Sequence, residues 1–99
     1  MKTNTALNFG KAFRLARKAR GVSQESLDQV SGRTYVSRLE RGLSIPTLEK
    51  VTKLAEPLGL HPLTLMTLSY CDELRVEEAE ALVLRVLTEI EQLQKHPLS

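Results

Sequence analysis

The chain has 99 residues, of which 41% are hydrophobic but only 4% aromatic, and its formal net charge is +2. This length suits one small domain with an appendage, and a core poor in aromatic residues favours helices over a β-sandwich. No apolar run reaches the roughly 18 residues of a membrane span, and no secretory apolar region opens the sequence, so we expect a cytoplasmic protein with no membrane contact.

Charge is unevenly distributed along the chain. Residues 1–70 hold 11 Lys and Arg against 5 Asp and Glu, whereas residues 71–99 hold 3 against 7. The first part therefore carries a net +6 and the second a net −4. A basic body indicates an anionic partner, and an acidic tail indicates a protein partner.

The first predicted helix covers residues 7–20. Its apolar residues recur at helical spacing and form the expected inward face. They are Phe9, Phe13 and Ala16, with Ala12 and Leu15 nearby. Gly21 follows the last turn, where a glycine ends helices well.

Residues 23–42 read as two short helices joined by a turn. Ser23 suits the N-cap of the first, because its hydroxyl can accept a backbone N–H that the first turn leaves without a partner. Gly32 can adopt the positive φ that a tight turn needs. In the second short helix Val36 and Leu39 face the core, which leaves a polar, cationic outer face that fits a DNA major groove.

Two further helices follow a loop that contains Pro46. Thr47 is the expected cap of a helix over residues 48–58. The predicted buried stripe of this helix consists of Leu48, Val51, Leu54, Ala55 and Leu58. Pro62 then opens a fifth helix, at the first helical position that proline favours.

Four motifs can be read together: SQE at residues 23–25, YVSRLERG at 35–42, IPTL at 45–48 and KLAEPLGL at 53–60. In combination they resemble the helix-turn-helix of the phage-repressor-like (XRE) family of bacterial transcription regulators. The resemblance spans about residues 9–66. It implies an all-α fold, a five-helix lambda-repressor-like DNA-binding domain, here with an additional C-terminal helix. Because the chain is two residues shorter than the family pattern between Gly32 and Arg33, Ser31 is the expected cap of the recognition helix.

The resemblance also implies roles for individual residues. The expected contacts to base edges come from Arg33, Thr34 and Arg38. The expected contacts to the DNA backbone come from Gln24, Tyr35, Ser37 and Arg41, with Thr47 and Lys53 as weaker candidates. The family pattern pairs Arg17 with Glu40 as a structural ion pair between the first helix and the recognition helix; the alternative for Arg17 is contact with phosphate.

The last predicted helix runs from Asp72, as its cap, to Lys95. Its apolar residues are spaced 4, 3, 4, 3, which is the seam of a coiled coil, and two further leucines widen that seam. The expected oligomer interface consists of Ala79, Leu82, Val83, Val86, Leu87, Ile90 and Leu93. This helix either folds back onto its own domain or pairs with another copy. We favour pairing, because the five-helix core that the resemblance implies is complete by about residue 68.

No catalytic or metal-binding constellation is present in the sequence. Cys71 is the single cysteine, which excludes an intrachain disulfide and a cysteine zinc site, and neither His61 nor His96 has a second ligand nearby. We therefore expect no enzymatic activity, no cofactor and no metal.

We expect a sequence-specific transcription regulator that binds a palindromic operator in double-stranded DNA as a homodimer or a larger oligomer such as a tetramer. Residues 6–69 would form the helix-turn-helix DNA-binding domain, and residues 70–99 a C-terminal helical oligomerisation segment. The alternative is an antitoxin-type protein-interaction module that neutralises a partner protein. Antitoxin tails are often disordered until bound, so the regular apolar seam of this tail favours self-association.

Overall fold

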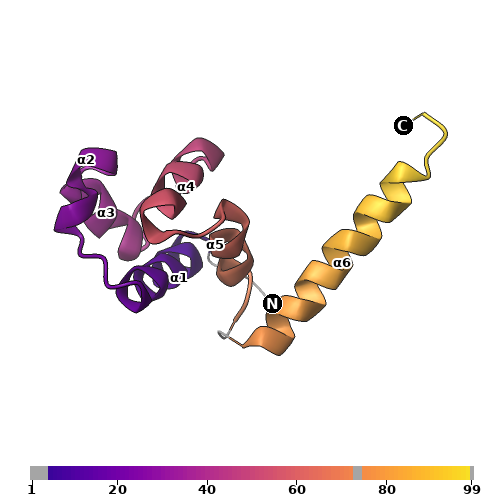
Figure 1. Ribbon diagram of the computed structural model, residues 1–99, viewed down its shortest axis with the longest axis horizontal. Coiled ribbons are helices and arrows are strands. Elements are labelled where there is room, and N and C mark those ends of the chain that lie inside the picture. The colour runs from indigo at the N-terminus through magenta and orange to yellow at the C-terminus, as the bar shows by residue number, and fades with distance from the viewer. Residues whose placement is uncertain (1–4, 73–74, 99) are drawn as a thin grey trace.

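The structure is a computed structural model that describes residues 5–72 and 75–98, with their side chains except at positions 5–7, 30 and 33. The elements in these ranges are α1 (Thr5–Ala19), η1 (Glu25–Leu27), α2 (Asp28–Ser31), α3 (Arg33–Glu40), α4 (Leu48–Ala55), η2 (Glu56–Leu58), α5 (Pro62–Ser69) and α6 (Val76–Gln94), where η marks a short 3-10 helix. Figure 1 shows α1 to α5 gathered into one body, with α6 extending away from it. The predicted all-α fold, a five-helix domain with an additional C-terminal helix, is confirmed.

The core lies inside the body. Its largest fully buried side chains are Phe13, Leu27, Val36, Leu39, Leu54 and Leu65. They come from α1, η1, α3, α4 and α5, and burying each of them stabilises the body by about 1.5–3 kcal/mol. By contrast α6, all of whose residues are described, has no buried side chain. The body therefore holds together without α6.

A close approach of α1 to α3 occurs at Gly10. A Cβ atom at this position would overlap the carbonyl oxygen of Leu39 and lie 3.0 Å from that of Glu40. Glycine inside a helix usually costs about 0.5–1 kcal/mol relative to alanine. Here the missing side chain lets the backbones of the two helices meet, and this contact fixes the position of α3 against α1.

Caps and a glycine define the elements around α3. The hydroxyl of Thr47 accepts the N–H of Lys50 at 3.1 Å, which confirms this predicted cap. The hydroxyl of Ser23 accepts the backbone N–H of Ser26 at 3.2 Å as expected, although Gln24 occupies the N-cap position of η1. Gly32 has a φ of +81° and joins α2 directly to α3. Because no further residue separates these helices, the orientation of α3 depends on this one glycine.

Two predicted helix starts are wrong. Ser31 does not cap α3, because it is the last residue of α2 and its hydroxyl is buried without a hydrogen-bond partner among the described residues. The last helix begins at Val76 and not directly after Asp72. Asp72 instead lies before the helix, and its backbone N–H donates to a carboxylate oxygen of Glu78 at 2.8 Å.

Two residues predicted to lie in or near the buried face of their helix are exposed. Leu15 is 47% exposed and Leu48 is 71% exposed, because the small body buries only a narrow stripe of α1 and α4. The fourth helix also changes to the tighter η2 after Ala55. Pro57 lies within η2, and its missing N–H and its ring explain why the α-helix does not continue.

Candidate nucleic-acid interface

The outer face of α3 presents polar side chains to solvent. Thr34 and Arg38 are exposed, whereas Val36 and Leu39 on the inner face are fully buried. Arg33 begins α3, and its side chain lies outside the part of the chain that the structure describes. The helix is thus anchored by apolar residues while it offers a hydroxyl and a guanidinium outward.

Two arginines near the end of α3 make only weak contacts. Arg38 donates through Nη2 to the carbonyl oxygen of Leu43 at 3.4 Å, and Arg41 donates through Nε to that of Ser37 at 3.3 Å. Both bonds are long and exposed to water, so their loss is a small energetic change. Either guanidinium can therefore turn toward another acceptor.

A buried ion pair lies beneath this surface. Arg17 donates to Glu40 through Nε at 2.7 Å and through Nη2 at 3.1 Å, and the two side chains are only 9% and 4% exposed. Arg17 also donates through Nη1 to the carbonyl oxygen of Val22 at 2.9 Å. Such a bidentate pair fixes geometry as well as charge, so it ties α1 to the end of α3. The alternative for Arg17, contact with phosphate, does not fit a buried guanidinium that is engaged in this way.

Gln24 extends the same network toward the surface. Its side-chain amide donates to Oε1 of Glu40 at 2.9 Å, and the residue is half-buried. An amide nitrogen has two N–H groups, so one remains for an outside acceptor. The ion pair thus orients the residue that the resemblance assigns to a phosphate.

The start of α4 lies beside α3. The Nζ of Lys50 is 5.1 Å from the centre of the Tyr35 ring, within the range of a cation–π contact. Burial raises the pKa of the Tyr35 phenol, so its hydroxyl keeps its proton and can donate a hydrogen bond. The hydroxyl of Thr47 accepts the N–H of Lys50 and can still donate its own proton.

Lys50, which contacts Tyr35 at this surface, was not among the residues predicted from the sequence. The available signal was its position in the first turn of a capped helix, where the helix dipole does not favour a positive charge.

The other two predicted backbone contacts are less constrained. Ser37 is half-buried on α3, and Lys53 lies 3.9 Å from Glu49 in an exposed ion pair within α4.

The part of the chain that the structure describes contains no metal-binding group and no exposed thiol. No group of three His, Cys, Asp or Glu residues there could hold a metal ion. The Nδ1 of His61 accepts the backbone N–H of Leu63 as a helix cap. Cys71 is buried and donates to the carbonyl oxygen of Thr67; burial, with the charges of Glu78 and Asp72, raises the pKa of its thiol. None of the described helices is long and apolar enough to cross a membrane.

Comparison with known proteins identifies this architecture. The sequence model of a family described as helix-turn-helix matches residues 13–65. The chain belongs to the XRE-like helix-turn-helix family. Among solved structures it is similar to the restriction-modification controller protein C.AhdI from Aeromonas hydrophila, with 40% identity and a TM-score of 0.56. That similarity covers 61% of this chain and 94% of the controller protein, and no curated protein sequence gives a significant match.

Membership in the XRE-like family makes the chain a DNA-binding transcription regulator and not an enzyme. The family match includes α3, the Arg17–Glu40 pair and Gln24. It ends within α5, and ten residues, 66–75, lie between its end and the start of α6. The family therefore accounts for the body and gives no account of α6.

Proposed function

We propose that this XRE-like regulator binds a palindromic operator as a dimer, and that the two copies are joined through α6. The observation that carries the proposal is the exposed seam of α6. Val83 and Val86 are each 44% exposed, and Leu93 is 70% exposed. An isolated helix is only marginally stable in water, whereas a heptad seam gains stability by packing against another helix.

The dimer interface in this proposal uses the residues expected from the sequence. They are Ala79, Leu82, Val83, Val86, Leu87, Ile90 and Leu93. Leucine, isoleucine and valine each gain about 1.5–3 kcal/mol when fully buried, and two-fold symmetry doubles the number of such side chains. That gain can offset the loss of freedom on association.

Within each copy, the proposal assigns base reading to Arg33, Thr34 and Arg38. Arginine can donate to O6 and N7 of guanine, and the methyl group of threonine can pack against that of thymine. Exposure of Thr34 and the weak contacts of Arg38 support this assignment. The proposed phosphate contacts are Gln24, Tyr35, Ser37, Arg41, Thr47 and Lys53, to which we add Lys50. They position the protein on DNA without reading its sequence.

The charge distribution supports separate roles for the two parts of the chain. We assign residues 6–69 to DNA binding and residues 70–99 to oligomerisation. The net +6 of residues 1–70 attracts phosphate, whereas the net −4 of residues 71–99 favours a position away from DNA. Similarity to a protein that controls a restriction-modification system supports a role in gene control.

The exposed seam of α6 also favours a second candidate function, an antitoxin-type module in which α6 grips a different protein. The two candidates predict different masses for the purified chain. Self-association predicts about twice 11.1 kDa in light scattering, and a protein that requires a foreign partner would remain at 11.1 kDa.

Selection of bound sequences from a random DNA pool tests the proposed function. We expect two inverted half-sites at a fixed spacing of one helical turn, about 34–36 Å, or a multiple of it. Recovery of a single half-site, or of sequences with no common spacing, would contradict binding as a symmetric dimer.

A further inference from the structure

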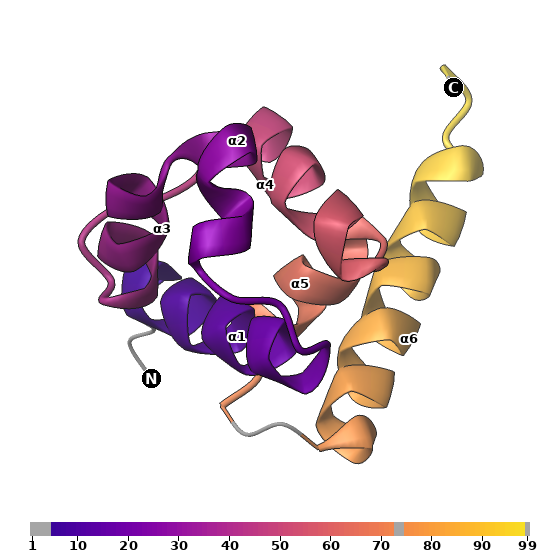
Figure 2. The ribbon, with the colours of Figure 1, turned by 60° about the vertical axis from the view of Figure 1, so that its left-hand side comes forward.

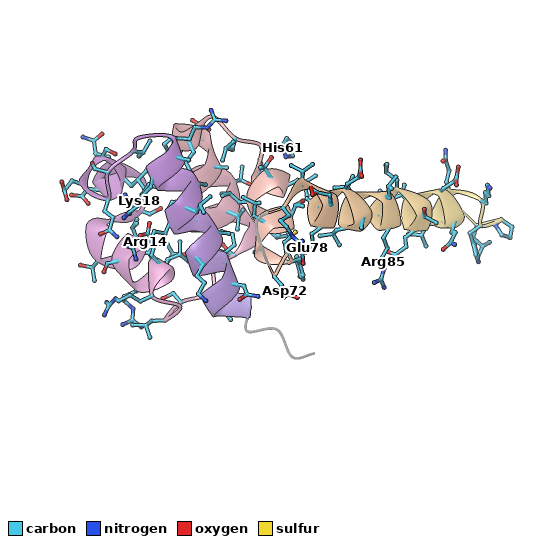
Figure 3. The ribbon with its side chains drawn as sticks, turned by 90° about the horizontal axis from the view of Figure 1, so that it is seen from below. Arg14, Lys18, His61, Asp72, Glu78 and Arg85 are labelled. Carbon is cyan, nitrogen blue, oxygen red and sulfur yellow. The ribbon has the colours of Figure 1, made fainter. Side chains whose placement is uncertain are left out.

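An exposed apolar groove of about 510 Å³ lies between α5 and α6. Leu63, Met66 and Tyr70 line one wall. The other wall consists of Leu82, Val83, Val86, Leu87 and Ile90. Leu63 is 60% exposed and Tyr70 is 61% exposed. Figure 2 shows α6 as a separate helix outside the body, and in Figure 3 Arg85, near the middle of α6, stands clear of the body. Apolar side chains gathered in an exposed groove favour an interaction there.

We propose that α6 of a second copy fills this groove and runs antiparallel to the first α6. The C-terminal half of each α6 would then lie against α5 of the other copy. This inference rests on the dimer proposed above and adds its orientation and its second contact surface. Three observations favour it: the sizes of the seam residues, the place of the groove and the charges of α6.

Residue size favours the antiparallel orientation. Val86 is the midpoint of the seam, with Ala79 seven residues before it and Leu93 seven residues after it. An antiparallel pair centred on Val86 therefore sets the small Ala79 against the large Leu93 of the partner at both ends. A parallel pair sets Ala79 against Ala79 and leaves a gap, and gaps forfeit packing contacts.

The position of the groove points to the same orientation. It lies between α5 and residues 82–90 of α6, whereas the end of α6 beyond the groove extends away from the body, with Leu93 70% exposed. An antiparallel pair brings this uncovered end of each helix to the other copy's Leu63 and Tyr70. A parallel pair would hold the two uncovered ends together, away from both grooves.

Charge disfavours the parallel alternative. Glu77, Glu78 and Glu80 lie in the first turns of α6, so a parallel pair would place six carboxylates together. Like charges in contact destabilise an interface. The antiparallel pair separates these two groups and brings to the partner's body the C-terminal half of α6, where Arg85 and the C-cap Lys95 balance Glu89 and Glu91.

Disulfide trapping between chains with one cysteine each tests the orientation. In a Cys71→Ala background, one chain carries Ala79→Cys and the other, marked by a size tag, carries Leu93→Cys; the two are refolded together and oxidised with a glutathione couple. Only interchain disulfides can form. We expect the crossed disulfide between the two chains as the main product, because it requires their Cα atoms to lie about 4.4–6.8 Å apart.

Ala81→Cys is the matched control, since it makes the same change two residues along, on the opposite face of α6. Mixed with the Leu93→Cys chain, it should lose the crossed product. Should an Ala79 or Leu93 variant fail to dimerise when reduced, Val83→Cys with Ile90→Cys repeats the test nearer the centre of the seam.

Two outcomes would overturn the inference in different ways. If two Leu93→Cys chains form a disulfide with each other in preference to the crossed product, α6 pairs in parallel. The antiparallel orientation is then wrong, but the proposed dimer through α6 is still supported. If neither pair of variants forms a disulfide while light scattering shows a dimer, the copies meet elsewhere. In that case the proposed role of α6 fails as well.

Discussion

Glu40 connects Arg17 of α1 and Gln24 to the end of α3 at the candidate nucleic-acid interface. It accepts hydrogen bonds from both Arg17 and Gln24, and its side chain is only 4% exposed. Removing one partner of a buried ion pair leaves the other charge buried and unpaired, which is more costly than loss of the attraction alone. The carboxylate of Glu40 therefore supports α1, α3 and the position of Gln24 together.

Glu40→Ala should lower the free energy of unfolding by about 3–5 kcal/mol, as measured by urea denaturation. Glu89→Ala is the control, because it removes the ion pair with Arg85, in which the two side chains are 55% and 76% exposed. Exposed pairs of this spacing contribute only about 0.3–0.5 kcal/mol. A Glu40→Ala protein as stable as the Glu89→Ala protein would show that the buried pair has no structural role.

Arg38→Ala should weaken binding to the selected operator by about 1–3 kcal/mol and relax the preference at one base pair. The reason is loss of a donor to a base edge, which no neighbouring side chain replaces at the same site. Titration of the operator and its single-base variants in a mobility-shift assay measures both effects. Arg85→Ala removes the same charge from α6 and should leave the base preference intact. Unchanged affinity and preference in Arg38→Ala would place base reading elsewhere.

Between elements, Gly10 determines how closely α1 and α3 pack. Alanine in place of glycine inside a helix normally stabilises a protein by about 0.5–1 kcal/mol. Gly10→Ala should do the opposite and destabilise by about 1–3 kcal/mol, because its Cβ meets backbone carbonyls that cannot rotate away. Thermal and urea unfolding give the sign. Thr52→Ala, at an exposed position inside α4, reports the gain in helix propensity less the exposed hydrogen bond from its hydroxyl to the carbonyl oxygen of Leu48. A stabilised Gly10→Ala protein would mean that α3 moves freely on α1.

Sequence predicted the elements well where the cause is local. The hydroxyl hydrogen bonds of Ser23 and Thr47 depend on residues three positions away, and the first helix was expected over residues 7–20 and found at Thr5–Ala19. Gly10 could not be recognised, because its neighbours are residues 39 and 40 and no local pattern encodes that contact. Leu48 fits the periodicity of α4, but the body does not extend far enough to cover it.

The candidate site was predictable to a similar extent. The resemblance supplied the pairing of Arg17 with Glu40, which lie 23 positions apart. The hydrogen bond from Gln24 to Glu40 and the contact of Lys50 with Tyr35 depend on how three helices meet. Such contacts require the three-dimensional arrangement of the helices, so periodicity and motif spacing did not indicate them.

For the whole molecule, the proposed division into a body and a pairing helix predicts that dimerisation can be lost without unfolding. Val86→Glu combined with Ile90→Glu should give folded monomers, because both side chains are exposed and the core contains no residue of α6. Buried carboxylates would oppose pairing of the seam. Circular dichroism checks folding, light scattering measures mass, and operator binding should weaken to that of a single half-site.

Ala81→Glu combined with Thr88→Glu is the matched control for that experiment. It adds the same two charges to α6 on the face opposite the seam, so the dimer should persist. If the Val86 and Ile90 variant keeps the wild-type mass, the seam does not join the copies.

Cys71 lies at the joint between the body and α6, and the rate at which thiol reagents label it can report local opening of the structure there. Thiol reagents attack the thiolate, and this thiol is buried with a raised pKa, so labelling at neutral pH must wait for the joint to open locally. The labelling rate should therefore rise with pH. It should also fall as protein concentration increases, because a second copy seated against Tyr70 makes opening rarer. Mass spectrometry of the native chain measures this labelling rate without an introduced probe. A labelling rate independent of protein concentration would mean that the proposed second copy does not cover the joint.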